Sequence, residues 1–287
     1  MDRILGIGKF GCAVADEFSE YPEYRVYKID DALSEKGTLS IKKYSNIEEY
    51  EENFEELEAE IYLRSIKEEN HVLIIVEGGT PISGVCLRVA QVVSSAKVSI
   101  LYVCPDRETI SNTQKRDDKI TFNVFQEYAR SGVFESIYLS HKPSIEQMVG
   151  DVAIPEYEKS LCRSLAYVVA MVNYLEHTES ILSTATEIPN TAKIKTLGLA
   201  SFSEERGTDQ EMVFLFPLKG AVDMQFLYGI SPESLEEDST MLGRIKKHIS
   251  GFTSEGLSVT YSVCASDLKP PMVFCSVSTG IVQSFPV

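Results

Sequence analysis

Three glycines near the N-terminus have the spacing of a phosphate-binding turn. They lie in Gly6-Ile7-Gly8-Lys9-Phe10-Gly11, between an apolar run and a segment of helical pattern. This spacing permits a tight turn and lets the backbone approach a phosphate, with a helix N-terminus aimed at the charge. Asp30 follows about 20 residues later, the offset of an acid that binds ribose hydroxyls. The pattern predicts phosphate binding, and a strand-to-helix turn without a ligand is the alternative.

A second glycine loop follows a strongly apolar run. Residues 71–76 are continuously hydrophobic after His71, which is typical of a parallel strand buried on both faces. They lead into Gly78-Gly79-Thr80-Pro81-Ile82-Ser83-Gly84. If both strands belong to one parallel sheet, both loops face the crevice at the carboxyl ends of the strands. A nucleotide held by several loops would explain the second loop, which a plain dinucleotide fold does not require.

The elements that must position these loops alternate between strand and helix patterns. Strands are predicted over 3–7, 24–29, 71–76, 98–104 and 134–139, and helices over 11–18, 45–66, 85–94 and 120–131. Such alternation predicts an α/β fold, with a parallel sheet and crossover helices.

The second half of the chain has a different pattern of predicted elements. Residues 157–174 form a helical pattern that is apolar on nearly all sides, as expected of a helix buried between layers. Strands are then predicted over 196–202, 212–218, 221–228, 257–264 and 272–278, with one helix opened by Ser231 and Pro232. This order predicts a smaller, mixed-sheet domain.

Residues of both loops resemble the tubulin/FtsZ superfamily. In its bacterial branch the first loop runs into Gly-Asn-Ala-Val, and this chain has Gly11-Cys12-Ala13-Val14. The family's Gly-Gly-Gly-Thr-Gly-Thr-Gly loop is similar to Gly78-Gly79-Thr80, which reaches Gly84 after an apparent one-residue insertion. The strand pair 257–264 and 272–278 resembles the family's last hairpin.

The resemblance implies a tubulin/FtsZ-like architecture in three parts. These would be a parallel-sheet, Rossmann-like nucleotide-binding domain over 1–155, a central helix with its following loop over 156–188, and a C-terminal α/β domain over 189–287.

The resemblance also implies a function. Proteins of this family bind GTP, stack head to tail into filaments and hydrolyse the nucleotide at the subunit junction, with acids of the next subunit spaced Asp-x-x-Asp. Glu176 and Glu179 occupy the matching place here, and carboxylates there can orient the attacking water. Glu108 is the implied ribose-binding acid. The implied ligands are therefore GTP or GDP with accompanying Mg²⁺, and the implied partner is a further copy of the chain. Polar residues at a fraying helix end are the alternative for the two glutamates.

Several residues depart from the family pattern. Lys9 and Phe10 replace small residues where the backbone must approach phosphate. Pro81 replaces a glycine and removes one N–H donor. Glu77 would repel a phosphate unless a metal ion or Lys9 offset its charge. Lys9 is either a phosphate counter-charge or a solvated lysine.

Composition narrows the function classes. The chain has 287 residues, of which 44% are hydrophobic, and a formal net charge of −16, which disfavours nonspecific nucleic-acid binding. No apolar run of about 18 residues predicts a membrane span. Six widely spaced cysteines indicate reduced thiols, and thus a cytoplasmic protein. The family resemblance implies a bacterial, archaeal or viral setting. The acidic run from Glu48 to Glu60 is a solvated helix face or a docking surface for a basic partner.

Three functional hypotheses follow. The first is a GTP-binding protein that assembles head to tail into filaments and hydrolyses GTP weakly. The second is a tubulin-like structural or binding module without hydrolysis, which the altered loops favour. The third is an NAD-dependent oxidoreductase, which rests on the first loop and Asp30. Whether the chain is an enzyme stays open between them.

Overall fold

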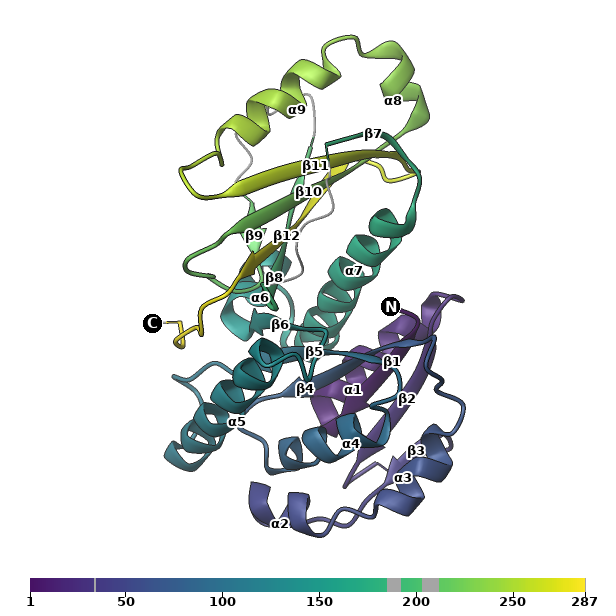
Figure 1. Ribbon diagram of the computed structural model, residues 1–287, viewed down its shortest axis with the longest axis vertical. Coiled ribbons are helices and arrows are strands. Elements are labelled where there is room, and N and C mark those ends of the chain that lie inside the picture. Colours follow the sequence, from purple (N-terminus) through teal and green to yellow (C-terminus); the bar gives the residue numbers. More distant parts are fainter. Residues whose placement is uncertain (34, 185–191, 203–211, 287) are drawn as a thin grey trace. The chain divides into compact units, whose positions relative to one another are not determined.

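Parallel strands β1 to β6 form the sheet of the N-terminal part of the chain (Figure 1). Their order is β3-β2-β1-β4-β5-β6. The strands are β1 (Arg3–Ile7), β2 (Arg25–Asp30), β3 (Thr38–Ser40), β4 (His71–Glu77), β5 (Lys97–Cys104) and β6 (Ser136–His141). The chain runs one way from β1 to β3 and the other way from β4 to β6. A crevice is therefore expected beyond the carboxyl ends of β1 and β4, where the winding direction changes.

The computed structural model describes residues 1–33, 35–184, 192–202 and 212–286. It divides into two compact units, Met1–Ala166 and Tyr167–Val287. The expected boundary between residues 188 and 189 lies outside the described residues.

Helices cover both faces of the first sheet. Helix α1 (Gly8–Glu17) packs on β1, β2 and β4, whereas α3 (Glu56–Leu63) packs on α4 (Cys86–Val92). Helices α2 (Ile47–Glu52) and α5 (Asn112–Arg130) contact the 3-10 turn at Pro81–Val85 that precedes α4. Helix α6 (Lys142–Val149) follows β6, and α7 (Tyr157–His177) is the long apolar helix that the sequence predicts. The expected α/β fold with a parallel sheet is confirmed.

Three helix predictions in the first unit are wrong in detail. Helix α5 begins at Asn112 rather than at residue 120, because Ser111 and Gln114 form a capping box there. Helix α1 begins at Gly8 rather than at residue 11, because the chain turns at once from extended Ile7 into the helix. The helix predicted over 45–66 is two helices, which are interrupted after Asn53. Asn46 caps the first of them, since its side chain accepts a hydrogen bond from the Glu49 amide.

The acidic helices also carry exposed apolar side chains. Leu57 and Ile61 of α3 are 68% and 58% exposed. Helix α3 turns Ala59 and Leu63 toward the core instead. The run from Glu48 to Glu60 is therefore a surface of mixed acidic and apolar character.

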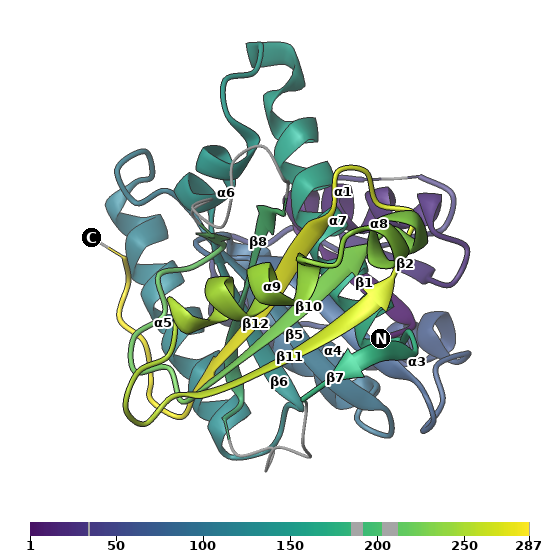
Figure 2. The ribbon, with the colours of Figure 1, turned by 90° about the horizontal axis from the view of Figure 1, so that it is seen from above.

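The C-terminal unit contains the expected mixed sheet, with strand order β8-β12-β10-β11-β7 and β9 on β8. Its strands are β7 (Ser180–Ser183), β8 (Ile194–Ser201), β9 (Val213–Phe214), β10 (Asp223–Ile230), β11 (Ser258–Ala265) and β12 (Met272–Thr279). Strands β10 and β11 are parallel, whereas β12 runs antiparallel to both β8 and β10. Two helices, α8 (Pro232–Glu237) and α9 (Met241–Ser250), lie on one face of the sheet where the sequence predicts one (Figure 2).

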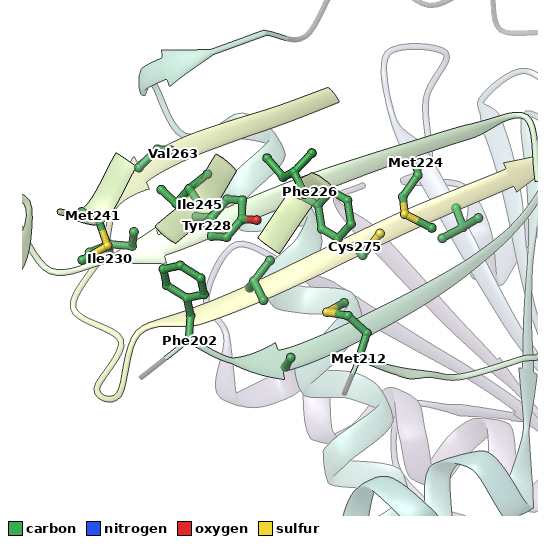
Figure 3. Packing of buried hydrophobic residues seen from close by; sticks show 14 residues of the cluster. Phe202, Met212, Met224, Phe226, Tyr228, Ile230, Met241, Ile245, Val263 and Cys275 are labelled. Atoms are coloured by element: carbon green, nitrogen blue, oxygen red, sulfur yellow. The ribbon is translucent and has the colours of Figure 1, made fainter. Parts of the chain in front are cut away.

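A hydrophobic core cluster, in which Phe202, Phe226 and Tyr228 are the aromatic members, packs between this sheet and α9 (Figure 3). Phe202, Phe226 and Tyr228 surround His248, and the Tyr228 hydroxyl lies 2.7 Å from His248 Nδ1. Burial lowers the pKa of His248, which favours the neutral form of this imidazole. The contact satisfies two polar groups inside an otherwise apolar core.

All six cysteines are buried and free. Burial raises the pKa of both Cys12 and Cys162 to about 12, and Cys12 lies close to the Asp30 carboxylate as well. A thiol with such a pKa is almost entirely protonated near pH 7 and is a poor nucleophile. Among the described residues, no helix is both long and apolar enough to cross a bilayer.

Thiol reactivity tests this burial. We expect a chromogenic disulfide reagent to modify fewer than about one thiol per chain in native protein at pH 7.5, and all six in denaturant, because thiolate character and access are both suppressed. Absorbance of the released thiolate measures both values. Rapid native modification of several thiols would contradict the buried arrangement.

Candidate functional site

The two glycine loops lie side by side. Ile7 at the end of β1 pairs with Val76 of β4, so the loops leave adjacent strands at the same edge. Gly8 has a φ of +72°, and a methyl group added there would lie 2.8 Å from the Ile82 Cγ2 atom of the second loop. The sequence-based expectation that both loops face one crevice is therefore met in the N-terminal unit, and the Ile82 side chain packs between them.

Both loops present backbone donors. The N-cap of α1 is Ile7, which offers no side-chain acceptor to the amides of the first helical turn. In the part of the chain that the structure describes, the amides of Gly79 and Thr80 donate no hydrogen bond, whereas the Ser83 amide donates to the Thr80 carbonyl at 3.0 Å. Unpaired amides at a helix N-terminus and a glycine turn can hold an anion.

Several glycines are required by packing alone. A methyl group at Gly6 would overlap the carbonyl of Gly11, and one at Gly11 would overlap the carbonyl of Ile75. A methyl group at Gly84 would overlap the carbonyl of Ile47. These residues let α1 and α2 approach the sheet and the second loop, so they do not by themselves indicate a phosphate.

Gly78 lies against a buried polar network. A methyl group there would overlap the Tyr102 hydroxyl and the Asp118 carboxylate. Asp118 is fully buried and accepts hydrogen bonds from the Tyr102 hydroxyl at 2.7 Å and from Arg107 at 3.3 Å. Thr121 lies 2.8 Å from the same hydroxyl. Burial raises the pKa of Asp118 to about 6, although Tyr102 and Arg107 both favour its ionised form.

Two ion pairs lie around the first loop, and each involves a charged residue that the sequence analysis did single out. Glu77 pairs with Lys142 of α6, so neither a metal ion nor Lys9 is needed to offset its charge. The Lys142 ammonium also lies 4.4 Å from the ring centroid of Phe10, which is 4% exposed. Lys9 instead forms an exposed pair with Glu158 at 3.0 Å. Each pair joins residues far apart in sequence, which hid them from motif analysis.

A cavity of about 410 Å³ opens beside the loops. It is lined by Lys9, Asp30, Asp31, Ala32, Leu33, Lys43, Tyr44, Tyr50, Thr80, Pro81 and Ile82. Asp30 is 2% exposed, and its Oδ1 atom accepts a hydrogen bond from the Asp31 amide at 2.9 Å. The Tyr50 hydroxyl donates to Asp31, and burial together with this bond raises the pKa of Tyr50 to about 12.

Cys12, Ser83 and Glu108 do not line this cavity, nor do Phe10 and the glycines of the two loops. Cys12 is buried beneath the first loop, where its thiol donates to the Gly6 and Ile29 carbonyls, so it is a packing residue there. Ser83 is 1% exposed, and its hydroxyl has no partner among the described residues. Glu108 is exposed in the turn after β5, and its amide donates to Asp106.

The two implied catalytic acids belong to the other unit. Glu176 lies in the last turn of α7, and Glu179 directly precedes β7; both are exposed. Helix α7 continues to His177, so Glu176 lies on the helix rather than in the expected loop.

The strand order and the two adjacent loops define a doubly wound α/β fold with a crevice at the carboxyl ends of the strands. No family model matches the sequence, and no curated protein matches it. Solved structures do match, and they have the tubulin/FtsZ fold.

The FtsZ dimer of M. jannaschii superposes with a TM-score of 0.73 at 12% identity, over 96% of this chain and 87% of that one. The GTPγS-bound protofilament of CetZ2 from Haloferax volcanii superposes with a TM-score of 0.74 at 12% identity. The match covers 97% of this chain and 92% of the CetZ2 chain. The GTPγS-form protofilament of TubZ from Bacillus thuringiensis serovar israelensis superposes with a TM-score of 0.72 at 11% identity. The match covers 99% of this chain and 88% of the TubZ chain. The chain therefore has the tubulin/FtsZ fold, and the expected resemblance is confirmed at the level of the fold.

A pH series tests the buried Asp118. Its pKa is about 6 in the folded chain and about 3.9 in an unfolded one, so its stabilising contribution is complete below pH 4 and lost as the pH rises through 6. Between pH 4 and pH 7 this loss is on the order of 3 kcal/mol. In Asp118→Asn the loss is absent, so the variant's free energy of unfolding should rise relative to wild type across that range.

Chemical denaturation at four pH values measures the effect. Glu108→Gln is the matched control, because Glu108 is exposed and should show no such difference. A difference in the free energy of unfolding between Asp118→Asn and wild type that is the same at every pH would contradict the raised pKa of Asp118.

Proposed function

We propose that this chain is a self-assembling protein of the tubulin/FtsZ type that binds GTP or GDP at its two loops and associates head to tail. The observation that carries the proposal is the fold match across 96–99% of the chain to proteins described as a dimer and as protofilaments. The proposal locates the protein in the cytoplasm and makes further copies of itself its principal partner.

Uncapped amides at the crevice support nucleotide binding. The first turn of α1 and the amides of Gly79 and Thr80 offer N–H donors to phosphate oxygens, and Lys9 adds a positive charge. These groups fit an anionic ligand. Mg²⁺ would be carried mainly by the phosphates, since the described residues contain no group of three metal-binding side chains.

Hydrolysis is proposed to be slow. Pro81 lacks an amide, so the second loop has one donor fewer for a developing negative charge. Glu176 and Glu179 would act from the neighbouring subunit by orienting water. A glutamate in place of an aspartate shifts its carboxylate, and small displacements of catalytic groups are costly.

A non-hydrolysing structural module is the second candidate. The specific observation that favours it is the packing at the first loop, where the Phe10 ring and the Lys142–Glu77 pair are in contact. Such a module would assemble without turnover. In either case the acidic surface from Glu48 to Glu60, with exposed Leu57 and Ile61, is proposed to dock a basic protein.

Sedimentation with GTP, GDP and no nucleotide, together with phosphate release, separates the two candidates. The first predicts pelleting that depends on nucleotide and turnover that rises faster than linearly with protein concentration. Pelleting in every condition, or in none, would favour the module.

We expect Glu176→Ala to lower phosphate release at least about tenfold without abolishing pelleting. Glu236→Ala, an exposed acid of α8, is the control. Unchanged release in Glu176→Ala would refute the catalytic role.

An exposed isoleucine marks a candidate assembly surface. Ile154 is 91% exposed in the segment before α7, four residues from Glu158, which pairs with Lys9 of the first loop. An apolar side chain this exposed beside the crevice suits burial against a second copy. Ile154→Asp should raise the protein concentration needed for pelleting at least about tenfold, because a charge would be buried in the interface. Ile61→Asp changes an equally apolar exposed residue of α3 and should leave it unchanged. Equal effects of the two substitutions would contradict this assignment.

A further inference from the structure

The N-terminal unit has a second cavity, between α4 and α5 at the point where β5 begins. Its volume is about 420 Å³. Among the described residues, none lines both this cavity and the one beside the glycine loops. A cavity of this size can accept a small ligand or a side chain of a partner protein. Its chemistry is therefore separate from that of the nucleotide site.

Apolar side chains form most of the wall of this cavity. Leu87 of α4 and Val98 of β5 contribute aliphatic surface. Tyr128, near the end of α5, packs edge-on against Phe134 with ring centroids 6.1 Å apart. Tyr128 is 39% exposed and Val133 is 61% exposed, so apolar surface at the cavity faces solvent. Exposed apolar side chains beside a cavity indicate a binding surface, and aromatic rings attract cations as well as apolar groups.

Backbone hydrogen bonds hold the aromatic wall in place. The amides of Val133 and Phe134 both donate to the Tyr128 carbonyl, at 3.0 and 3.4 Å. Phe134 is only 1% exposed. The turn after α5 is thus fixed to the end of the helix before any partner arrives. A site formed in advance loses less conformational entropy on binding than one that must first become ordered.

The charge beside the cavity is negative on the side of α2 and α3. Glu51 lines the cavity, and the Arg88 guanidinium lies 3.8 Å from its carboxylate and 3.6 Å from that of Glu56. The run from Glu48 to Glu60 contains eight glutamates and no lysine or arginine. Because α3 packs on α4, this acidic surface is continuous with the cavity. Arg88 offsets only part of its negative charge.

These groups determine which occupant fits. An acidic ligand would be repelled by the acidic surface, and a second copy of the chain has a net charge of −16. A small cation would leave the apolar wall exposed to water. A segment that carries a bulky apolar side chain next to lysine or arginine residues fits both the wall and the acidic surface.

We propose that this cavity binds a basic amphipathic segment of a partner protein. A bulky apolar side chain of the segment enters between Leu87, Tyr128 and Phe134. Flanking lysine or arginine side chains pair with Glu51, Glu56 and other glutamates of α2 and α3. This inference rests on the docking of a basic protein that is proposed above, and it adds the site at which the partner is held. It is independent of nucleotide binding and of contacts between copies of the chain.

Fluorescence anisotropy with the full chain and three labelled peptides tests the proposal. The first probe is a short amphipathic peptide of leucine and lysine. Serine replaces leucine in the second probe, and glutamate replaces lysine in the third. Wild type should bind the leucine–lysine peptide at least about tenfold more tightly than either of the others, because apolar contact and charge pairing are both required. A photoreactive leucine analogue in this peptide should cross-link to α4 or to residues 128–134.

A substitution in the wall tests the apolar contact. Tyr128→Ser should weaken binding of the leucine–lysine peptide at least about tenfold, because it removes one side of the cavity. Tyr174→Ser is the matched control, since Tyr174 of α7 is 46% exposed and should not affect the affinity.

A second pair of variants tests the charges. Glu51→Gln combined with Glu56→Gln should weaken binding at least about fivefold and should make the affinity less dependent on salt. Glu236→Gln combined with Glu237→Gln removes two exposed acids of α8 and should change neither property.

The remaining outcomes would overturn the proposal. Equal binding of the leucine–lysine and serine–lysine peptides by wild type would exclude an apolar contact, and so would cross-links confined to other elements. Tighter binding of the leucine–glutamate peptide would indicate an acidic partner held by Arg88. A loss of pelleting in Tyr128→Ser would assign the cavity to contacts between copies of the chain. Absence of binding by all three peptides would remove the partner site and leave nucleotide binding and assembly, which sedimentation measures, unaffected. The wild-type comparison needs no variant, so it stands even if a substitution impairs folding.

Discussion

The candidate site depends on one constraint, the close backbone contact of helix α1 with strands β1 and β4. This contact lies where the winding direction of the first sheet changes. Helix α1 approaches β1 and β4 so closely that Gly6 and Gly11 have no room for a side chain. This contact directs the first turn of α1 at the carboxyl edge of the sheet, beside the loop after β4. The donors of both loops converge because the strands are adjacent and parallel. The same geometry would exist without any ligand, so the glycines establish the site's shape, whereas its chemistry comes from the residues around it.

The second loop is supported from beneath by buried polar groups. Gly78 rests on Tyr102 and Asp118, and Arg107 adds a positive charge to the same network. Such networks are stable only when each member is satisfied, and they then fix one arrangement of the backbone above them. The position of Gly79, with its φ of +72°, is thus tied to helix α5 through contacts that no loop motif reveals. The core beneath the loop, together with the glycines that permit this close approach, therefore fixes the shape of the loop.

The sequence predicts the alternation of elements well, because buried parallel strands such as residues 71–77 are continuous apolar runs. It fails where tertiary contacts decide the outcome. Residues 45–66 have one helical period, yet the first helix ends at Glu52 and a second begins at Glu56. Leu57 and Ile61 of the second helix are exposed. In the site, local spacing identified both loops and Asp30. It could not identify Lys142 or Glu158, because their partners Glu77 and Lys9 are distant in sequence.

These ion pairs bear on how an acidic chain can hold an anion. With a net charge of −16, the chain as a whole repels phosphate, so binding must depend on local donors. The Lys9–Glu158 pair is exposed, and such pairs contribute only about 0–1 kcal/mol, so Lys9 can exchange Glu158 for a phosphate at little cost. Lys142 is more buried and neutralises Glu77, and it also contacts the Phe10 ring. The two lysines therefore differ in role: Lys142 removes an unfavourable charge from the crevice, and Lys9 is the one that can reach a ligand.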